Sequence, residues 1–505
     1  MLGTVPVAAP ESSGEIDLAE TYAPKTFNPL LSLKDNERDI ASLIYIPLAA
    51  RDENLELTPG DRPGEQLLID WSFDDRKQSL KMEVNPRARW HSGLPVTAAD
   101  IAFTLELIGR LEFSPYFDLV EGIEVVTPLN NNMLLAEVQS PGLDWNKAES
   151  LLGLTLLPDD SQFAAMTLQA MEEIGREPIG NGPFKLAKFE DNSLVRLEAA
   201  RSPGEGGPRI TALNFHVIPE ASSQLMQATS GDIDFVMLRS RDVETARSSL
   251  NLRVKGYPSR YIVFVGYNHR LEWLSEITDA LGRAIDVDAI IDGPMAGNGR
   301  RIASPVLPSD PCFIDEMLPF DPVRAGILLD ESGWKLSSDG YRSRDGRRLK
   351  LKLLTDSSQG TKDIALVIQQ RWKAVGVDCE LEHQEWNLVS TRFAAGEFEA
   401  LLYGLKMPLI TDPAPYLHGS PDIGAFNYGA YQNAEMDANL DALAASDSAA
   451  RCFAIEEIQM LCLELQPNTY LYDRDRFIAV STRLRNVKVD VRGRFARVLE
   501  WKLAD

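Results

Sequence analysis

The side chains that most often perform chemistry are few in this chain and widely spaced. The sequence contains no Gly-x-Ser-x-Gly, no His-Glu-x-x-His and no Walker loop, and Gly297-Asn298-Gly299 lacks the third glycine of a dinucleotide loop. No two histidines have the spacing that places a metal-binding pair on one helical face; they stand at His91, His216, His269, His383 and His418. We therefore expect a protein that is not an enzyme and that carries no cofactor or metal.

The cysteines give no redox or zinc motif, because no Cys-x-x-Cys occurs among Cys312, Cys379, Cys452 and Cys462. Cys452 and Cys462 fall on one predicted helix, about 15 Å apart, which is too far for a disulfide. Cys379 alternates with Val377 and Leu381, so we expect a small core residue. Cysteine usage leaves the compartment open.

Composition bounds the class of protein. A chain of 505 residues is expected to form two or three domains, and 44% hydrophobic with 25% charged residues is typical of a soluble globular protein. A net charge of −24 argues against a nucleic-acid partner. No run of 18 apolar residues exists. Residues 1–10 lack the basic and long apolar regions of a signal peptide, which leaves either a cytoplasmic chain or one whose signal segment precedes this sequence.

The elements that must position any site alternate between strands and helices. The turn Gly180-Asn181-Gly182-Pro183 introduces a hairpin over 184–198, and we expect its glycines to supply positive φ. Two strand–helix–strand crossover units follow, at 210–238 and 349–381, and they indicate an α/β fold with parallel strands. Residues 1–20 are interpreted as a loose lead-in. Further helices are predicted at 40–48, from Thr97, at 163–174, 276–292, 433–445 and 449–465, and further strands at 67–73, 79–84, 123–126, 134–138, 261–268 and 468–480.

Seven short motifs in a fixed order resemble the family-5 solute-binding proteins, the peptide and nickel receptors of ABC importers. Each motif alone is weak, but together they cover roughly residues 40–480. They are the aromatic-His-Asp-Gly-like stretch Trp90–Phe103, the Gly-Thr-Gly-Pro-Tyr-like turn Gly180–Phe184, Gly231-Asp232-Ile233-Asp234, the Arg-x-Ala-Ile-like Arg283–Asp288, Ala325–Trp334, the Gln-Gln-x-Trp-Lys tract within Ile368–Val377, and Gln384-Glu385-Trp386.

The resemblance implies a two-lobed periplasmic-binding-protein-like α/β fold of type II, cluster C, with an extra inserted domain. By analogy, lobe I comprises 1–53, 179–266 and 478–505, the inserted domain 54–178, and lobe II 267–477. Two such lobes close around a ligand in the cleft between them.

The family's ligand contacts can be carried over position by position. Glu37 corresponds to a lobe-I contact, Tyr116 to a ring that faces the cleft from the inserted domain, and Asn268, after Tyr267, to a residue that bonds the ligand backbone. The remaining predicted contacts are Trp386, Tyr470 and Tyr472. The alternative for each is an ordinary surface or core residue.

One departure from the family pattern concerns the ligand's charge. Peptide receptors place an Asp about four residues before an acidic-Pro pair, where it binds the peptide's α-amino group. This chain has the pair as Asp412-Pro413 but Leu409 at the amine-binding position, or Pro408 if a one-residue insertion is placed earlier. Leucine cannot neutralise a buried ammonium. We therefore expect Lys406 to pair an anionic group of the ligand, or else to point to solvent.

The resemblance implies an extracytoplasmic substrate-binding protein of an ABC transporter, periplasmic or on the cell surface, that captures a peptide or peptide-like solute. Its expected partners are the ABC permease and ATPase subunits, and we expect a monomer. Three alternatives stay open. The first is a receptor for a non-peptide ligand, such as an oligosaccharide, an opine-like anion or a metal chelate that His418 contacts. The second is a sensor domain. The third is an enzyme, although no catalytic motif supports it.

Overall fold

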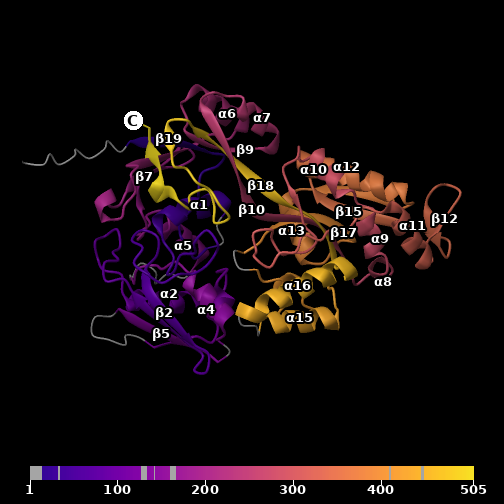
Figure 1. Cartoon of the computed structure of the whole chain (residues 1–505), viewed down its shortest axis with the longest axis horizontal. Coiled ribbons are helices and arrows are strands. Elements are labelled where there is room, and N and C mark those ends of the chain that lie inside the picture. The colour runs from indigo at the N-terminus through magenta and orange to yellow at the C-terminus, as the bar shows by residue number, and fades with distance from the viewer. Residues whose placement is uncertain are drawn as a thin grey trace, which may run out of the picture. The chain divides into compact units, whose positions relative to one another are not determined.

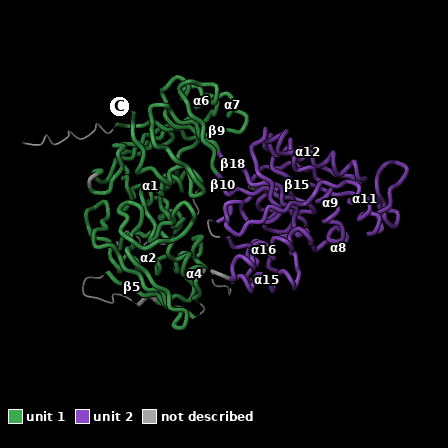
Figure 2. Tube along the Cα trace, viewed as in Figure 1, with its two compact units in different colours: residues 1–257, 477–505 green, residues 258–476 purple. Residues whose placement is uncertain are grey.

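The computed structural model describes residues 14–31, 34–126, 134–141, 143–159, 167–408, 411–444 and 448–504. They form two compact units, shown in separate colours in Figure 2. Unit 1 comprises residues 1–257 and 477–505, and unit 2 comprises residues 258–476. The chain passes from one unit to the other within two long strands, β10 (Leu252–Tyr267) and β18 (Asn468–Ser481). The three-part division with an inserted domain stays a prediction.

A mixed sheet forms the centre of unit 1, with its strands in the order β9, β1, β8, β7, β6. β1 pairs in parallel with β8 and β9, the end of β18 pairs antiparallel with β9, and β6 and β7 form the predicted hairpin. The bounds are β1 Glu15–Glu20, β6 Phe184–Glu190, β7 Leu194–Ala199, β8 Ala212–Val217 and β9 Phe235–Leu238, with α6 Ala221–Ser230 and α7 Val243–Arg247 after β8 and β9.

The prediction that residues 1–20 form a loose lead-in is wrong for 15–20. Strand β1 lies between β8 and β9, so it separates the two strands of the predicted crossover unit at 210–238. Ile16 and Leu18 are fully buried. The segment is short and acidic, and its acidic side chains are paired. Arg196 donates to the Glu15 carboxylate through Nη1 and Nη2, each at 2.7 Å, and His216 Nε2 lies 2.8 Å from Asp17. Partners from distant strands were invisible in the local sequence.

A second, antiparallel sheet in unit 1 has the strand order β2, β3, β5, β4. Helix α2 begins as predicted, because Thr97 and Asp100 form a capping box. The bounds are β2 Leu68–Asp74, β3 Ser79–Val84, β4 Glu124–Val126, β5 Leu135–Gln139, α2 Ala98–Ile108, α3 Phe117–Val120, α4 Trp145–Leu152 and α5 Leu168–Ile174. The helix predicted at 163–174 falls partly outside the described residues.

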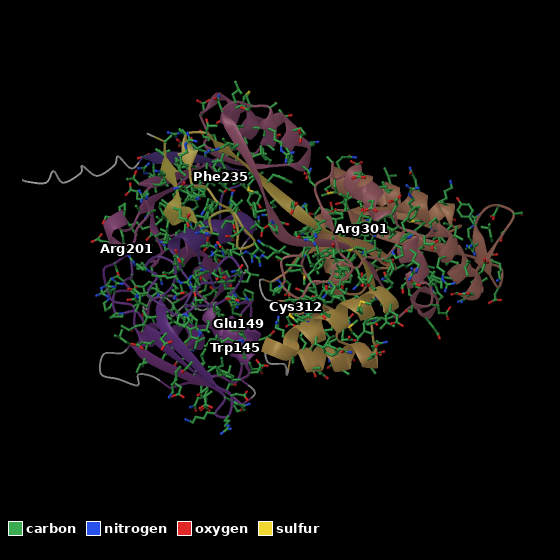
Figure 3. The ribbon with its side chains drawn as sticks, in the orientation of Figure 1. Trp145, Glu149, Arg201, Phe235, Arg301 and Cys312 are labelled. Atoms are coloured by element: carbon green, nitrogen blue, oxygen red, sulfur yellow. A yellow bond between two sulfur atoms is a disulfide. The ribbon has the colours of Figure 1, made fainter. Side chains whose placement is uncertain are left out.

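A buried arginine joins three segments of unit 1. Arg494 is 2% exposed, with Nη2 at 2.6 Å from Glu20 and Nε at 2.7 Å from Asp39. Glu20 ends β1, and Asp39 lies on α1 (Asp35–Ile44), which begins and ends earlier than the helix predicted at 40–48. Figure 3 shows Phe235 in the same unit, where its ring stacks on that of Trp501 at 5.5 Å. The short pair β19 (Leu484–Arg485) and β20 (Lys502–Leu503) completes the C-terminal segment.

The turn before β6 depends on close backbone contact rather than on positive φ, which corrects the prediction. The N–H groups of Asn181 and Gly182 both donate to Ile44 O, at 3.0 and 2.8 Å. A Cβ on Gly180 would lie 2.0 Å from that same oxygen, and neither glycine has a positive φ. His91 closes the turn: its N–H donates to Gly180 O at 2.7 Å, and its Nε2 lies 3.0 Å from Gly182 O.

Unit 2 is built on a sheet with the strand order β16, β15, β17, β10. The predicted crossover unit at 349–381 is confirmed, because β15 and β16 pair in parallel on either side of α12. Figure 1 shows α15 and α16 packed side by side in this unit. The bounds are β15 Lys350–Asp356, α12 Gln359–Ala374, β16 Asp378–Gln384, α13 Trp386–Ala394, β17 Ala400–Lys406, α14 Ala414–Leu417, α15 Ala434–Ala444 and α16 Ser448–Leu465.

The helical region predicted at roughly 276–292 is divided into two short helices, α9 Thr278–Arg283 and α10 Val287–Asp292, and a further short helix, α8 Glu272–Ser275, precedes it. The N-terminal side of α10 is capped by Asp286, whose side chain accepts from Ala289 N, and this cap begins a new helix inside the apolar pattern. The remaining elements of the unit are β11 Arg300–Arg301, α11 Pro322–Glu331, β12 Lys335–Leu336, β13 Arg342–Arg344 and β14 Arg347–Arg348.

A disulfide joins Cys312 to Cys452 on α16, across 140 residues of sequence, and Cys312 is labelled in Figure 3. Cys379 and Cys462 are free and buried. No sequence pattern indicated this pairing, whereas the interpretation of Cys379 as a core residue agrees with its burial. In the chain-entropy account, closing so long a loop stabilises the folded state by about 5 kcal/mol. Among the described residues, no helix combines the length and the apolarity needed to cross a membrane.

The His91 turn predicts a loss of stability in weak acid. Burial lowers the pKa of His91 from its ordinary 6.5 to about 4. Between these values the unfolded chain binds the proton and the folded chain does not, so stability falls as pH drops from 6.5 towards 4, by at most about 3 kcal/mol. His91→Gln, which retains a donor for Gly182 O, should flatten this part of the profile. Thermal midpoints at several pH values measure it, and parallel profiles for the two proteins would contradict the assignment.

Candidate functional site

A pocket in unit 2 lies among the ends of β10 and β17, helix α13 and the segment that follows α14. The space between its lining residues amounts to about 460 Å³ when the open solvent at its mouth is counted, and most of its lining side chains are phenylalanine or tyrosine. Strand β10 contributes Phe264 and Tyr267, α13 contributes Phe393, and β18 contributes Tyr470. A concave, mainly apolar surface with a few polar groups is the usual form of a small-molecule site.

One side of this pocket continues into a series of ring contacts that we call the aromatic wall: Tyr403, Phe393, Tyr428, Phe426 and Tyr416. Successive ring centroids are 4.7, 4.9, 6.1 and 5.6 Å apart. Trp386, the first residue of α13, stacks on Tyr403 at 4.9 Å with the planes 9° apart. Trp386 is 42% exposed and Phe426 48% exposed, so large apolar surface stays open to solvent.

The segment 418–431, which carries part of the aromatic wall, is fixed mainly by Asn427. Its Nδ2 donates to His418 O at 3.0 Å and to Tyr431 O at 2.8 Å, and its Oδ1 accepts from Tyr431 N at 3.0 Å. One half-buried amide therefore closes the loop on itself. Loops held in this way present side chains with little conformational freedom.

The same segment is bound to the end of β10 through the backbone. The N–H of His269 donates to Gly429 O at 2.8 Å, and Arg270 Nη1 donates to Tyr428 O at 2.9 Å. A Cβ on Gly429 would lie 2.4 Å from Tyr267 O, closer than real Cβ contacts come. The pocket therefore requires a glycine at this position.

The pocket is electrically neutral. Among the described residues that line it there is no Asp, Glu, Lys or Arg. Burial lowers the pKa of His269 below its ordinary value, and both ring nitrogens have partners, Ser275 Oγ at 3.0 Å and Pro467 O at 2.8 Å. Burial likewise raises the pKa of Tyr416 to about 12 and that of Tyr470 well above its usual value. At neutral pH the imidazole is uncharged and the phenols keep their protons.

Comparison with known proteins assigns the chain to a family. The model of the bacterial extracellular solute-binding proteins, family 5, matches residues 63–422, well over half of the chain. The chain belongs to this family.

Relatives and solved structures extend the similarity to nearly the whole length. The oligopeptide-binding protein AppA of Bacillus subtilis is 26% identical over 516 aligned residues, which span 98% of this chain and 92% of AppA. The probable D,D-dipeptide-binding periplasmic protein DdpA of Escherichia coli is 21% identical over 92% of this chain and 89% of its own length. The structure of AppA in complex with a nonapeptide superposes with a TM-score of 0.80 over 98% of this chain and 100% of that one, at 24% identity. NikA from Brucella suis, in complex with Fe(III)-EDTA, gives 0.84 over 97% and 100%, at 17% identity. The predicted periplasmic-binding-protein-like fold is thereby confirmed.

Several of the predicted contacts of this family-5 protein gather near the pocket. Tyr267 and Tyr470 line it, Leu405 beside Lys406 lines it, and Trp386 stacks on the first ring of the aromatic wall. Lys406 is the last residue of β17 and pairs in register with Tyr261. Their contact with a ligand stays a prediction.

Other predicted contacts have side chains that already hold the structure together. Asn268 is 7% exposed, and its Nδ2 donates to Gly396 O at 3.0 Å and to Phe398 O at 2.8 Å. The Tyr267 hydroxyl lies 2.8 Å from Thr469 Oγ1. Tyr472 is 2% exposed and packs in the core cluster around α9 to α12, apart from the pocket.

The predicted contacts in unit 1 are likewise well bonded. Glu37 is 4% exposed, and its carboxylate accepts from the N–H groups of Lys25 at 2.8 Å and Lys34 at 2.9 Å. Tyr116 precedes α3 and packs against the unit-1 core, and burial raises its pKa. Leu409 lies outside the described residues.

His418, weighed as a contact to a metal chelate, is 6% exposed and accepts from Ser420 N at 3.0 Å through Nδ1. Its Nε2 lies 3.4 Å from Asp441. In the part of the chain that the structure describes, no group of three His, Cys, Asp or Glu side chains is placed to hold a metal ion. The geometry gives His418 a structural position.

Sequence reasoning missed most of the aromatic wall. Tyr416, Phe426, Tyr428 and Tyr431 fall within 16 residues, and this density of rings was the available signal. Phe393 gave none, because an apolar residue at helical spacing is normally a core residue. Tyr403 gave none for the same reason within a buried strand.

The close approach of Gly429 to Tyr267 O predicts that a side chain at position 429 lowers the stability of the pocket. Gly429→Ala places a methyl group 2.4 Å from Tyr267 O, so the segment 424–431 must move and the ring contacts of the aromatic wall must weaken. We expect a lower thermal midpoint and reduced near-UV circular dichroism. Gly360→Ala is the matched control, because a Cβ at Gly360 meets nothing within 4 Å. Equal behaviour of the two variants would show that the segment tolerates a side chain at Gly429.

Proposed function

We propose that this family-5 protein is an extracytoplasmic receptor that captures a peptide or peptide-like solute and delivers it to an ABC permease. The observation that carries the proposal is the match along nearly the full length to AppA, an oligopeptide-binding protein, together with the family-5 profile over 63–422. The relatives of Brucella are also described as putative ABC transporter peptide-binding proteins, at 28% identity over 65% of this chain.

The pocket and the aromatic wall support capture of a solute. Stacked and tilted rings offer large contact area at a small cost in conformational entropy, and they bind side chains of varied shape. The neutral lining favours the apolar parts of a ligand, and nothing in the arrangement is placed to activate a nucleophile. The predicted outcome is binding and release of an unchanged ligand.

The disulfide Cys312–Cys452 supports the proposed location outside the cytoplasm, periplasmic or on the cell surface. Disulfides persist in oxidising compartments and are rare where thiol reductants act. The proposed partners are the permease and ATPase subunits of the transporter, and the proposed state of the receptor is a monomer.

A second candidate, a non-peptide ligand on the same fold, is favoured by the segment before Asp412-Pro413. This segment has neutral Leu409, or Pro408 if a one-residue insertion is placed earlier, at the position where the peptide receptors carry an amine-binding Asp, and cationic Lys406 stands nearby. A ligand with an anionic group in place of a free α-amino group fits that pattern. The agropinic-acid complex of AgaA shares the fold, with a TM-score of 0.74 at 17% identity, and its ligand is a property of AgaA alone.

Native mass spectrometry of the protein purified from its own source tests the proposal directly. We expect a retained ligand whose fragments are those of peptides, in a mixture of masses. One non-peptide mass would instead establish the second candidate. Conversion of offered peptides into products of new mass would overturn the receptor function and establish an enzyme.

The retained ligand then tests Lys406. If an anionic group of the ligand forms an ion pair with Lys406, Lys406→Ala should weaken ligand binding roughly 10-fold, as expected for the loss of a charge-assisted hydrogen bond. The matched control is Lys352→Ala, an exposed lysine on the neighbouring strand β15. Equal affinities for the two variants would remove Lys406 from the site.

The compartment is tested by thiol labelling of protein taken from intact cells. We expect Cys312 and Cys452 to resist alkylation even after denaturation, because they are oxidised. Cys379 and Cys462, which are free and buried, should react only after denaturation, and they serve as internal controls. Alkylation of all four cysteines without a reductant would contradict an oxidising compartment.

A further inference from the structure

The pocket of unit 2 has a polar end as well as apolar sides. Tyr431 lines the pocket and is 8% exposed, and its buried hydroxyl has no hydrogen-bond partner among the described residues. The hydroxyl of Tyr470, which is 6% exposed, accepts from Asn468 Nδ2 at 3.5 Å. Tyr416 and Asn468 line the same pocket as Tyr431 and Tyr470. Three phenols therefore gather where Asn468 supplies an amide.

A buried hydroxyl without a hydrogen-bond partner destabilises the folded state. The hydroxyl of Tyr431 can donate one bond and accept others, and the hydroxyl of Tyr470 has similar capacity left. A ligand that carries its own hydroxyl could both accept a hydrogen bond from one tyrosine and donate one to the other. A purely hydrocarbon ligand would leave Tyr431 as it is.

The sides of the pocket exclude charge. None of its described lining residues is Asp, Glu, Lys or Arg, and His269 packs edge-on against Tyr431 at 5.0 Å with both of its nitrogens bonded elsewhere. A carboxylate or ammonium that entered would lose its water without gaining a counter-ion, so its entry would be unfavourable. Phe264, Phe393 and Phe426 instead offer ring faces and edges to a flat neutral group.

We propose that this pocket binds a phenol, an uncharged ring that carries a hydroxyl, as one part of the captured solute. A tyrosine-type side chain has this chemistry. The ring would pack among the aromatic side chains, and its hydroxyl would bond Tyr431 and Tyr470. The inference rests on the proposed function, which it deepens by naming the chemical class that the pocket selects.

The test uses four small probes in place of the unidentified solute: p-cresol, toluene, 4-methylbenzoate and 4-methylbenzylammonium. They share one methylated ring and differ in hydroxyl, hydrocarbon, anionic and cationic character. Saturation-transfer NMR and isothermal calorimetry on the full chain measure their binding. We expect p-cresol to bind most tightly, toluene more weakly by roughly 3- to 10-fold, and the two ions not measurably.

Variants assign the effect to the pocket. Tyr431→Phe keeps the ring and removes the hydroxyl. The affinity for p-cresol should therefore fall to that for toluene, while the affinity for toluene stays unchanged. Tyr470→Phe is the second variant, and it should weaken p-cresol in the same direction. Phe453→Ala is the control, because Phe453 is 69% exposed on α16 and does not line the pocket, and it should leave all four probes unchanged.

Two results would overturn the proposal: either ion binding as tightly as p-cresol, or both tyrosine variants retaining the wild-type preference for p-cresol over toluene. Failure to detect any of the probes would overturn it as well. These outcomes are separate from a failure of the receptor function, because peptides retained by the native protein would still be seen by mass spectrometry without any preference for phenols.

Discussion

The pocket of unit 2 depends on one backbone contact, the approach of Gly429 to the end of β10. The strand supplies Tyr267 O, the residue His269 just after it supplies an N–H to Gly429 O, and no side chain fits at Gly429. This contact sets the distance between the sheet and the rings of Tyr428 and Tyr431. The aromatic wall then packs from α13 outward, with Phe393 touching both Tyr403 and Tyr428. Backbone groups thus join the segment 418–431 to the end of β10. The aromatic side chains of the segment are not used in this contact and can face a ligand.

Unit 1 depends on ion pairs that neutralise the acidic side chains of its central strand. Its central strand β1 carries Glu15, Asp17 and Glu20, and each meets a cationic or ionisable partner: Arg196, His216 and Arg494. Arg494 is the most enclosed of these, and a buried charge of this kind is stable only while its partners remain. The first strand, the first helix and the C-terminal segment consequently depend on one another. A net charge of −24 is compatible with a compact unit because cations are placed at these points.

Much of the fold could be predicted from the sequence, because its signals are local. The β6–β7 hairpin, the capped start of α2 and the parallel pair β15–β16 around α12 follow from alternation, capping residues and helical spacing. The errors have a common cause in partners far along the chain. Strand β1 is too short and too acidic to be recognised without β8 and β9. The break before α10 depends on the single cap at Asp286. The glycines of the turn before β6 were expected to supply positive φ, whereas they make room for Ile44 O.

The site was harder to predict, since its residues are ordinary core types until the chain has folded. Trp386, Tyr267 and Tyr470 were found by resemblance, and each lies at or beside the pocket. Phe393 and Tyr403 could not have been found, because nothing distinguishes a wall ring from a core ring in one sequence. Asn268 shows the opposite case: its amide is recognisable from the motif, yet its donors are bonded to Gly396 O and Phe398 O.

The bond between Cys312 and Cys452 has a consequence for how the protein matures. Its second sulfur emerges from the ribosome 140 residues after the first, and Cys379 emerges between them. The thiol of Cys379 is therefore present before that of Cys452. Folding of β15, α12 and β16 buries Cys379 and so withdraws this alternative partner from Cys312. Burial of one free thiol thus favours the crosslink that the structure contains.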